Sequence, residues 1–130
     1  MLLVKTRIEP SLIHGIGLFA DEAIAKGTII WRCAPGLDLV FDESIRAALP
    51  VVARQDFMKY AYLDRDTGKY VLCFDDARFL NHSDEPNIVD GHDNKDGWGI
   101  DIAAREIAAG EELTCNYKDF DADFDWKLRR

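Results

Sequence analysis

The apolar and β-branched residues of this chain occur in short runs, and turn residues close each run. Residues 28–33, rich in β-branched and aromatic side chains, follow Lys26-Gly27, and residues 113–117 follow Ala109-Gly110. Short runs of this composition, bounded by glycine, are typical of β-strands. Many such strands and few helical segments predict a mostly β domain that is built from several small sheets.

The predicted strands are spread over the whole chain. They cover residues 3–8, 17–20, 28–33, 37–41, 60–63, 69–74, 98–103 and 113–117. Leu37, Leu39 and Phe41 alternate with Asp38 and Val40, so the first three side chains are expected on the better buried face of their strand. A loop over residues 64–68 contains a glycine between two predicted strands, which indicates a hairpin.

Helical signals are confined to the middle of the chain. Asp42 is expected to cap a helix over residues 43–49, whose first turn carries an acidic residue. Pro50 ends or restarts this helix, because proline lacks an N–H and clashes with the preceding turn. Residues 52–58 continue a weak helical pattern, and residues 91–97 are predicted to form a polar turn.

The size and composition fit one domain over residues 1–130. A hydrophobic fraction of 48% favours a folded core over disorder. No apolar run approaches the roughly 20 residues that cross a bilayer. Charges at Lys5 and Arg7 interrupt the amino-terminal segment too early for a signal peptide. We therefore expect a cytoplasmic protein without a membrane partner.

The net charge of the chain is −8. This balance argues against direct binding of nucleic acid, which requires a basic surface. It is compatible with a basic protein or peptide as partner, because long-range attraction draws a cation towards an acidic surface. Solubility alone explains the charge equally well.

The cysteines and histidines show no spacing that is typical of a metal site. They are Cys33, Cys73 and Cys115, and His14, His82 and His92. No C-x-x-C pair is present, so neither a zinc knuckle nor a disulfide framework is expected, and reduced thiols fit a cytosolic location. We expect no metal.

Three patches carry more polar chemistry than a plain fold requires. In residues 14–19, Gly15 and Gly17 flank one residue, which allows positive φ or a close approach of backbone to a ligand, although a simple turn would do the same. Residues 78–87 combine a cation, an aromatic ring, two amides, an imidazole and a proline. That density indicates a loop that holds a polar ligand or locks another segment, or else a well-capped turn. In residues 111–117, Tyr117 is either a core residue or a phenol that orients an amine.

Taken in this order, the three patches resemble the motifs of the SET-domain protein lysine methyltransferases. Gly15-Ile16-Gly17 is similar to the G-x-G of that family. Residues 78–87 are similar to its R-F-x-N-H-x-x-x-P-N signature, and residues 112–117 to its E-L-T-x-D-Y end. The resemblance covers about residues 13–117 and leaves residues 118–130 as an acidic and aromatic tail.

The resemblance implies a β-clip-like fold of several small sheets with few short helices. It also implies a C-terminal pseudoknot, in which residues 112–117 pass beneath the loop that holds Asn81 and His82. Threaded chains are rare, so the polar groups of that loop would have a structural task as well.

The activity implied by the resemblance is transfer of a methyl group from S-adenosyl-L-methionine to a lysine amine in a protein substrate. The residues that would bind the cofactor are Ile16, Gly17, Arg78, Phe79, Asn81, His82 and Tyr117, and Tyr117 would also be catalytic. The residues that would line the substrate channel are Tyr60 or Tyr62, Cys115 and Trp126.

The implied chemistry makes physical sense. Methyl transfer is an in-line displacement, so a narrow channel that fixes the line between amine and methyl group supplies much of the acceleration. An apolar, aromatic channel disfavours the ammonium form of the lysine and lowers its pKa. Tyr117 would then orient the neutral amine, and water would remove the proton before alignment.

The chain departs from the family pattern in several places. Asn116 stands where an aspartate is usual before the tyrosine, and Cys115 stands where an aromatic residue is frequent. The cysteine-rich zinc modules of the family are missing. Phe120, Phe124 and Trp126 of the tail are hypothesised to fold back and supply the missing wall of the site.

Two other functions remain open from the sequence. One is a catalytically weak SET-fold module that binds a basic peptide, which Asn116 and Cys115 favour. The other is an unrelated β-rich binding protein, which the ordered motifs disfavour. The resemblance also admits a homodimer, and it leaves the substrate and the number of methyl groups open.

Overall fold

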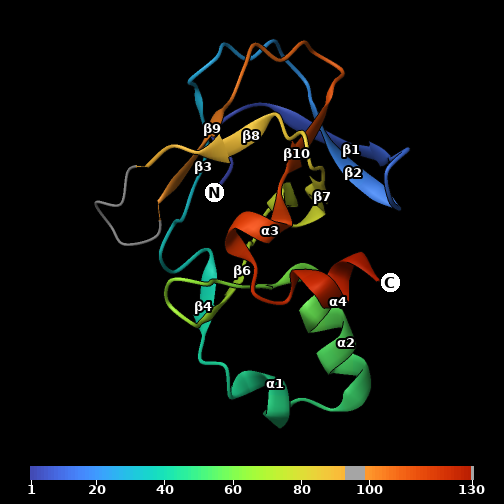
Figure 1. Cartoon of the computed structure of the whole chain (residues 1–130), viewed down its shortest axis with the longest axis vertical. Coiled ribbons are helices and arrows are strands. Elements are labelled where there is room, and N and C mark those ends of the chain that lie inside the picture. Colours follow the sequence, from blue (N-terminus) through green and yellow to red (C-terminus); the bar gives the residue numbers. More distant parts are fainter. Residues whose placement is uncertain (93–98, 130) are drawn as a thin grey trace.

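The computed structural model of the protein describes residues 1–92 and 99–129. Over these residues the chain forms three small sheets and several short helices (Figure 1). No helix in them is long and apolar enough to span a membrane. The predicted fold class, mostly β with small sheets and few short helices, is confirmed.

The first sheet joins strands from both ends of the chain. Its strands, in spatial order, are β1 (Thr6–Pro10), β2 (Ile16–Ala20), β10 (Glu112–Cys115) and β7 (Asn81–His82). β1 and β2 form an antiparallel hairpin. β10 is antiparallel to β2 but parallel to β7, where Thr114 pairs with Asn81. The carboxyl-terminal strand therefore lies between two strands that precede it by about 30 and about 95 residues in the sequence.

The other two sheets have three antiparallel strands each. The second consists of β3 (Ile29–Arg32), β9 (Ile100–Ala103) and β8 (Ile88–Asp90). The third consists of β4 (Leu39–Phe41), β6 (Tyr70–Leu72) and β5 (Tyr62–Leu63). β5 and β6 are the hairpin predicted around residues 64–68. In Figure 1 the first two sheets occupy the upper part of the molecule, and the third lies below them.

The helices are short and lie mainly beside the third sheet. They are α1 (Ile45–Ala48), α2 (Val51–Tyr60), the 3₁₀ helix η1 (Asp76–Phe79), α3 (Tyr117–Phe120) and α4 (Phe124–Leu128). α2 begins directly after Pro50, whose ψ of 155° is extended, so the predicted restart at this proline is confirmed. Tyr60 therefore ends a helix and does not belong to the strand predicted over residues 60–63.

The main core lies where the first two sheets meet. Leu18, Ile30, Ile88, Ile107 and Leu113 are each at most 3% exposed and belong to one cluster. Burial of a large aliphatic side chain contributes roughly 1.5–3 kcal/mol to folding. Because β2, β8 and β10 all supply residues to this cluster, the core fixes the strands that also carry the polar patches.

The predicted burial pattern of residues 37–41 is wrong. Leu37 and Leu39 are 51% and 46% exposed, whereas Asp38 is 2% exposed. The Asp38 carboxylate accepts hydrogen bonds from the amino group of Met1 at 2.8 Å and from the Ala34 N–H at 2.7 Å. These donors replace water, so the polar member of the alternation faces inward.

The predicted cap at Asp42 is also wrong. The first helix begins at Ile45 after Ser44, and no side chain caps it. Asp42 instead forms an exposed ion pair with Lys69, with 2.6 Å between Oδ1 and Nζ. The polar turn predicted over residues 91–97 and the Trp98 end of the predicted strand lie largely outside the described residues.

The loop over residues 83–87 holds β10 on the side opposite to β2. Asn87 is 4% exposed, and its side chain brackets the strand. Its Nδ2 donates to the Glu112 carbonyl at 2.8 Å, and its Oδ1 accepts from the Thr114 N–H at 2.8 Å. The Ser83 N–H donates to the Cys115 carbonyl at 3.0 Å. These contacts hold the C-terminal segment against the loop, as the predicted pseudoknot requires.

The C-terminal tail folds back onto β5. The Ala122 N–H donates to the Leu63 carbonyl at 2.8 Å, and the Leu63 N–H donates to Asp121 Oδ1 at 3.1 Å. Asp121 is fully buried and forms an ion pair with Lys127 at 2.8 Å. Lys127 Nζ also donates to the Ala61 carbonyl at 2.6 Å. The tail is therefore an integral part of the wall around β5.

Candidate functional site

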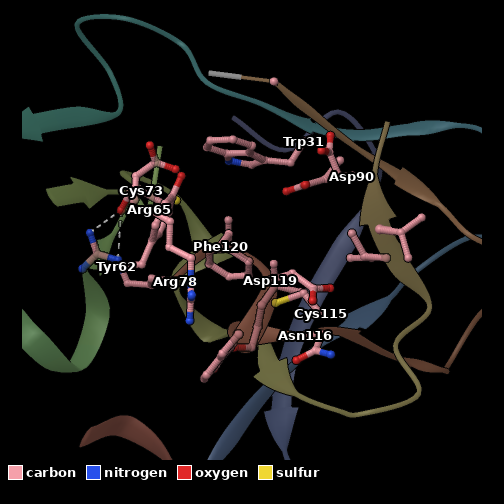
Figure 2. Close-up of a pocket in the computed structure, with 18 of the residues that line it drawn as sticks. Trp31, Tyr62, Arg65, Cys73, Arg78, Asp90, Cys115, Asn116, Asp119 and Phe120 are labelled. Atoms are coloured by element: carbon pink, nitrogen blue, oxygen red, sulfur yellow. Dashed lines mark hydrogen bonds between the residues drawn. The ribbon is translucent and has the colours of Figure 1, made fainter. Parts of the chain in front are cut away.

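A pocket of about 230 Å³ lies between the second sheet, the third sheet and the C-terminal tail (Figure 2). Its lining includes Trp31, Tyr60, Tyr62, Arg78, Leu80, Asp90, Asp101, Cys115, Tyr117, Phe120 and Lys127. These residues come from β3, α2, β5, η1, β8, β9, β10, α3 and α4 and from the turn after η1. The lining combines aromatic and apolar side chains with many charged ones, and a concave pocket where such groups converge is the usual form of a binding site.

Tyr117 is fixed at both ends by the polar segment over residues 78–87. It is the first residue of α3, directly after β10 and Asn116. Its N–H donates to His82 Nδ1 at 3.1 Å, and its hydroxyl donates to the Leu80 carbonyl oxygen. Because Nδ1 of His82 accepts, the ring proton of the neutral imidazole is on Nε2, which faces Asp84 at 3.2 Å.

Aromatic rings form one wall of the pocket beside Tyr117. Phe120 packs edge-on against Tyr62, with ring centroids 5.0 Å apart, and against Tyr117 at 6.1 Å. Such edge-to-face contacts are the favoured geometry for aromatic pairs. Burial, followed by the negative charges that Cys73 and Asp101 would carry, raises the pKa of Tyr62 well above its ordinary value, so its phenol is neutral.

Tyr60 and Arg78 form a second group at the edge of the pocket. The guanidinium of Arg78 lies over the Tyr60 ring at 5.4 Å, and its Nη2 donates to the Cys73 carbonyl at 2.7 Å. Tyr60 also packs edge-on against Phe79, with ring centroids 5.8 Å apart, and Lys59 Nζ lies 5.2 Å from the centroid of the Tyr60 ring. The arginine is therefore held in place by a backbone acceptor and an aromatic face.

Asn81 lies in a corner that is rich in hydrogen-bond acceptors. Its Nδ2 is 3.0 Å from the His14 carbonyl, 3.4 Å from the Ile16 carbonyl and 2.9 Å from Glu112 Oε1. A Cβ on Gly17 would lie 2.1 Å from Glu112 Oε1, so a larger residue here would displace that carboxylate. One amide has two N–H groups and here meets three acceptors, so acceptor capacity is left over.

Trp31, Asp101 and Asp90 lie side by side across the second sheet. Trp31 on β3 pairs with Asp101 on β9, and Asp101 pairs with Asp90 on β8. Burial, followed by the nearby charge of Asp90, raises the pKa of Asp101 to about 7, although the amino terminus at Met1 lowers it slightly. The pocket thus has an acidic side opposite its aromatic wall.

The cysteines near the pocket are neutral thiols. Burial, followed by the charge of Asp101, raises the pKa of Cys115 far above its ordinary value, and burial and Asp38 raise the pKa of Cys73 to about 12. A buried, protonated thiol is a small apolar lining group and not a nucleophile. Among the described residues, no group of three or more His, Cys, Asp or Glu side chains could hold a metal ion.

The structure separates the residues predicted for the site into two sets. Those that line the pocket are Tyr60, Tyr62, Arg78, Cys115 and Tyr117; those that do not are Ile16, Gly17, Phe79, Asn81, His82 and Trp126. The two sets meet at Tyr117, whose ring centroid is 5.4 Å from that of His82. The sequence left Tyr60 and Tyr62 as alternatives, and the structure places both in the lining.

The aromatic tail supplies part of the pocket wall. Phe120 and Lys127 line the pocket, whereas Phe124 lies 5.3 Å below the Arg65 guanidinium and Trp126 is not in the lining. Sequence reasoning missed Trp31, Asp101 and Lys127. An acidic residue inside the apolar strand over residues 100–103 is the signal that would have indicated Asp101.

The small sheets, the bracketed C-terminal strand and the pocket beside Tyr117 together define a SET-type domain. A family model described as SET domain matches residues 15–118 of the chain. The chain belongs to the SET-domain family.

The chain is similar to known methyltransferases over a small part of their length. It is 35% identical to histone-lysine N-methyltransferase trithorax of Drosophila virilis, and the match covers 83% of this chain and 3% of that protein. Human histone-lysine N-methyltransferase 2B is 30% identical, with 83% of this chain and 4% of that protein covered.

One solved structure combines the same fold with a bound cofactor. It is ctPRC2 in an autoinhibited conformation bound to S-adenosylmethionine, with a TM-score of 0.65 and 26% identity. The match covers 97% of this chain and 16% of that chain.

Proposed function

We propose that this chain is a protein-lysine N-methyltransferase that uses S-adenosyl-L-methionine. The observation that carries the proposal is the position of Tyr117. Its hydroxyl is bonded to the Leu80 carbonyl at the edge of a pocket that Tyr62, Cys115 and Phe120 also line. Membership of the SET-domain family and the similarity to histone-lysine methyltransferases support the same reading.

The corner around Asn81 fits the polar end of the proposed cofactor. The His14 and Ile16 carbonyls and Glu112 are acceptors for an amino group; Asn81 Nδ2 lies near all three, and Glu112 also accepts from the Ser11 hydroxyl at 2.8 Å. His82 follows Asn81 in β7, and its ring lies 5.4 Å from that of Tyr117. Ile16, Gly17, Asn81 and His82 would therefore hold the cofactor, which supplies a methyl group on a sulfonium sulfur.

Tyr117 would orient the amine that accepts the methyl group. Its hydroxyl donates its proton to Leu80, and a phenol oxygen that donates in this way is by its chemistry also an acceptor for an N–H of the substrate. The two bonds of Tyr117 to His82 and Leu80 fix the ring before substrate arrives. A fixed acceptor contributes through orientation and not through strong proton abstraction.

The neutral members of the lining beside Tyr117 would lower the pKa of the substrate lysine. Tyr62 and Cys115 are protonated, and Phe120 is apolar. An ammonium that leaves water for such surroundings loses solvation, so the free amine is favoured. The small Cys115 side chain leaves room around the amine. Mass spectrometry of the product would show how many methyl groups the lysine receives.

Asn116 does not favour the alternative of a catalytically weak module. Its side-chain oxygen accepts from the Lys118 N–H at 3.1 Å and caps α3. Asparagine and aspartate are about equally good caps. The departure from the family pattern at this position therefore preserves the element that positions Tyr117.

A direct test uses labelled cofactor and a mixed protein extract, with methylated lysines identified by mass spectrometry. Labelled lysines in basic proteins are the expected result. Cofactor binding without any labelled protein would favour the alternative, a SET-fold module that binds a basic peptide.

The role of Tyr117 has its own test. Tyr117→Phe keeps the ring but removes the hydroxyl, so kcat should fall by about a hundredfold or more while cofactor affinity stays within about threefold. Tyr70→Phe is the matched control, because it removes a hydroxyl that is bonded to Asp123 and does not line the pocket. Full turnover in Tyr117→Phe would remove Tyr117 from this role.

A further inference from the structure

The acidic side of the pocket is a continuous row of three side chains. Trp31, Asp101 and Asp90 are cross-strand partners, and residues directly opposite each other in a sheet project from the same face. All three line the pocket. Figure 2 shows Trp31 and Asp90 close together at one end of the pocket, with the nitrogen-bearing edge of the indole turned towards the other lining residues.

Two features of this row do not serve the fold. Asp90 and Asp101 are like charges directly opposite each other, an arrangement that destabilises a sheet. Trp31 is 6% exposed, and its buried Nε1 has no hydrogen-bond partner among the described residues. A buried donor without an acceptor costs about 1–3 kcal/mol. Local violations of this kind are expected where a site is built for a ligand.

The row runs from the interior of the pocket to its mouth. Trp31 is buried, Asp101 between it and Asp90 is partly buried, and Asp90 is exposed. Asp90, with a side chain that is 61% exposed, lies at the outer end, where it accepts from the backbone N–H of His92 at 2.8 Å and its Oδ2 is 3.6 Å from His92 Nδ1. No metal-binding group exists among the described residues, so a cation from a substrate chain is the better match.

The row has two unmet requirements, and one basic residue of a peptide satisfies both. Trp31 needs an acceptor, which a main-chain carbonyl supplies, and the two carboxylates need a cation, which the side chain supplies. The target lysine itself is a poor occupant, because adjacent carboxylates stabilise an ammonium and the reaction needs the free amine.

We propose that Trp31, Asp101 and Asp90 form a specificity subsite for a second basic residue of the substrate, near the target lysine in its sequence. The subsite rests on the proposed function, because it assumes that a lysine-containing chain enters this pocket. It makes Asp101 and Asp90 binding residues, whereas Tyr117 orients the reacting amine.

Binding to synthetic peptides tests the subsite without any methyl transfer. The probes are short labelled peptides with one central lysine, in which either arginine or its neutral analogue citrulline occupies each flanking position in turn. At one or two positions, arginine should bind about tenfold more tightly than citrulline by fluorescence anisotropy. The preference should shrink as salt is added.

Variants assign this preference to the row. Asp101→Asn and Asp90→Asn should each reduce the arginine preference severalfold and leave the citrulline peptides unchanged. Asp56→Asn removes the same charge from an exposed position of α2 outside the pocket and should change neither. The pair of variants keeps the test valid if one of them fails to fold.

The outcomes separate the subsite from the methyltransferase activity. Equal binding of arginine and citrulline peptides by the unmodified protein would overturn the subsite, even if it methylates both. The preference for a flanking arginine should persist when norleucine replaces the central lysine. Loss of the preference in the norleucine peptides would also overturn the subsite. Selective binding without any methyl transfer would retain the subsite and contradict the proposed function.

Discussion

Asp38 and Asp121 are buried carboxylates with cationic partners, whereas Asp101 has no such partner among residues 1–92 and 99–129. Asp38 is paired with the amino group of Met1, and Asp121 with Lys127, both at 2.8 Å. Asp101 receives no hydrogen bond that lowers its pKa; instead burial and Asp90 raise it. A charge that is buried without a partner is disfavoured, so the folded state prefers the protonated form of Asp101.

This preference makes the stability of the fold depend on pH in a definite direction. The pKa of Asp101 rises from an ordinary 3.8 to about 7 on folding. The folded state therefore binds more protons than the unfolded state between these values, and stability falls as pH rises from about 4 to about 7. Asp101→Asn should thus be more stable than the unmodified protein at pH 8 by roughly 1–3 kcal/mol, and about equal near pH 4.

Urea unfolding of both proteins at several pH values measures this difference. The comparison cancels Asp84 and Glu111, whose pKa values are lowered by Lys118 and Arg105 respectively and which titrate in both proteins. A stability gap that is constant from pH 4 to pH 8 would contradict the burial of an unpaired Asp101.

At the scale of single residues, the sequence predicted the roles of some side chains well and those of others not at all. The segment over residues 78–87 was predicted from its own hydrogen-bonding groups, and it does hold Tyr117. The position of Trp31 beside Asp101 depends on the register between β3 and β9, which are far apart in sequence. The burial of Asp38 likewise depends on Met1. Local patterns carry no information about such distant partners.

At the scale of elements, β10 depends on the loop beside it as much as on its sheet neighbours. Asn87 supplies both a donor and an acceptor to the backbone of β10, as a neighbouring strand would do. The strand signals located β10 to within two residues, because turn residues bound it. Its place beside the loop of Asn81 and His82 was implied by the resemblance and not by local pattern, and its parallel pairing with β7 was not predicted.

Removal of the Asn87 side chain should destabilise the protein strongly. Asn87→Ala leaves the Glu112 carbonyl and the Thr114 N–H unpaired in a buried site, which should cost about 2–4 kcal/mol. Asn116→Ala removes only the exposed cap of α3 and should cost about 1 kcal/mol. Chemical denaturation measures both values, and equal losses would mean that Asn87 does not bracket the strand.

At the scale of the whole molecule, the tail closes the site that the earlier residues begin. Phe120 and Lys127 supply lining, and the buried pair of Lys127 and Asp121 fixes the tail to β5 through Ala61 and Leu63. The sequence indicated an aromatic wall from this tail. The contribution of Lys127 could not be predicted, since a lysine near the end of a chain is ordinarily a solvated charge.

Deletion of the tail should open the pocket. A chain that ends before residue 120 loses Lys127 and also Phe120, which packs on Tyr117 next to His82, so affinity for S-adenosyl-L-methionine should fall about tenfold or more by calorimetry. Deletion of residues 128–130 alone retains the pair of Asp121 and Lys127 and should leave the affinity nearly unchanged. Unchanged affinity in the longer deletion, with the fold intact by circular dichroism, would exclude the tail from cofactor binding.

The position of β10 between β2 and β7 also affects how the chain folds while it is being synthesised. The hairpin of β1 and β2 leaves the ribosome early, but the partner for its open edge follows only when residues 112–115 have been made. Until then β2 presents unpaired backbone groups, which are a template for pairing with another chain. A nascent or truncated chain without residues 112–115 should therefore aggregate. β10 thus completes the candidate site and also covers the edge of β2, which would otherwise pair with another molecule.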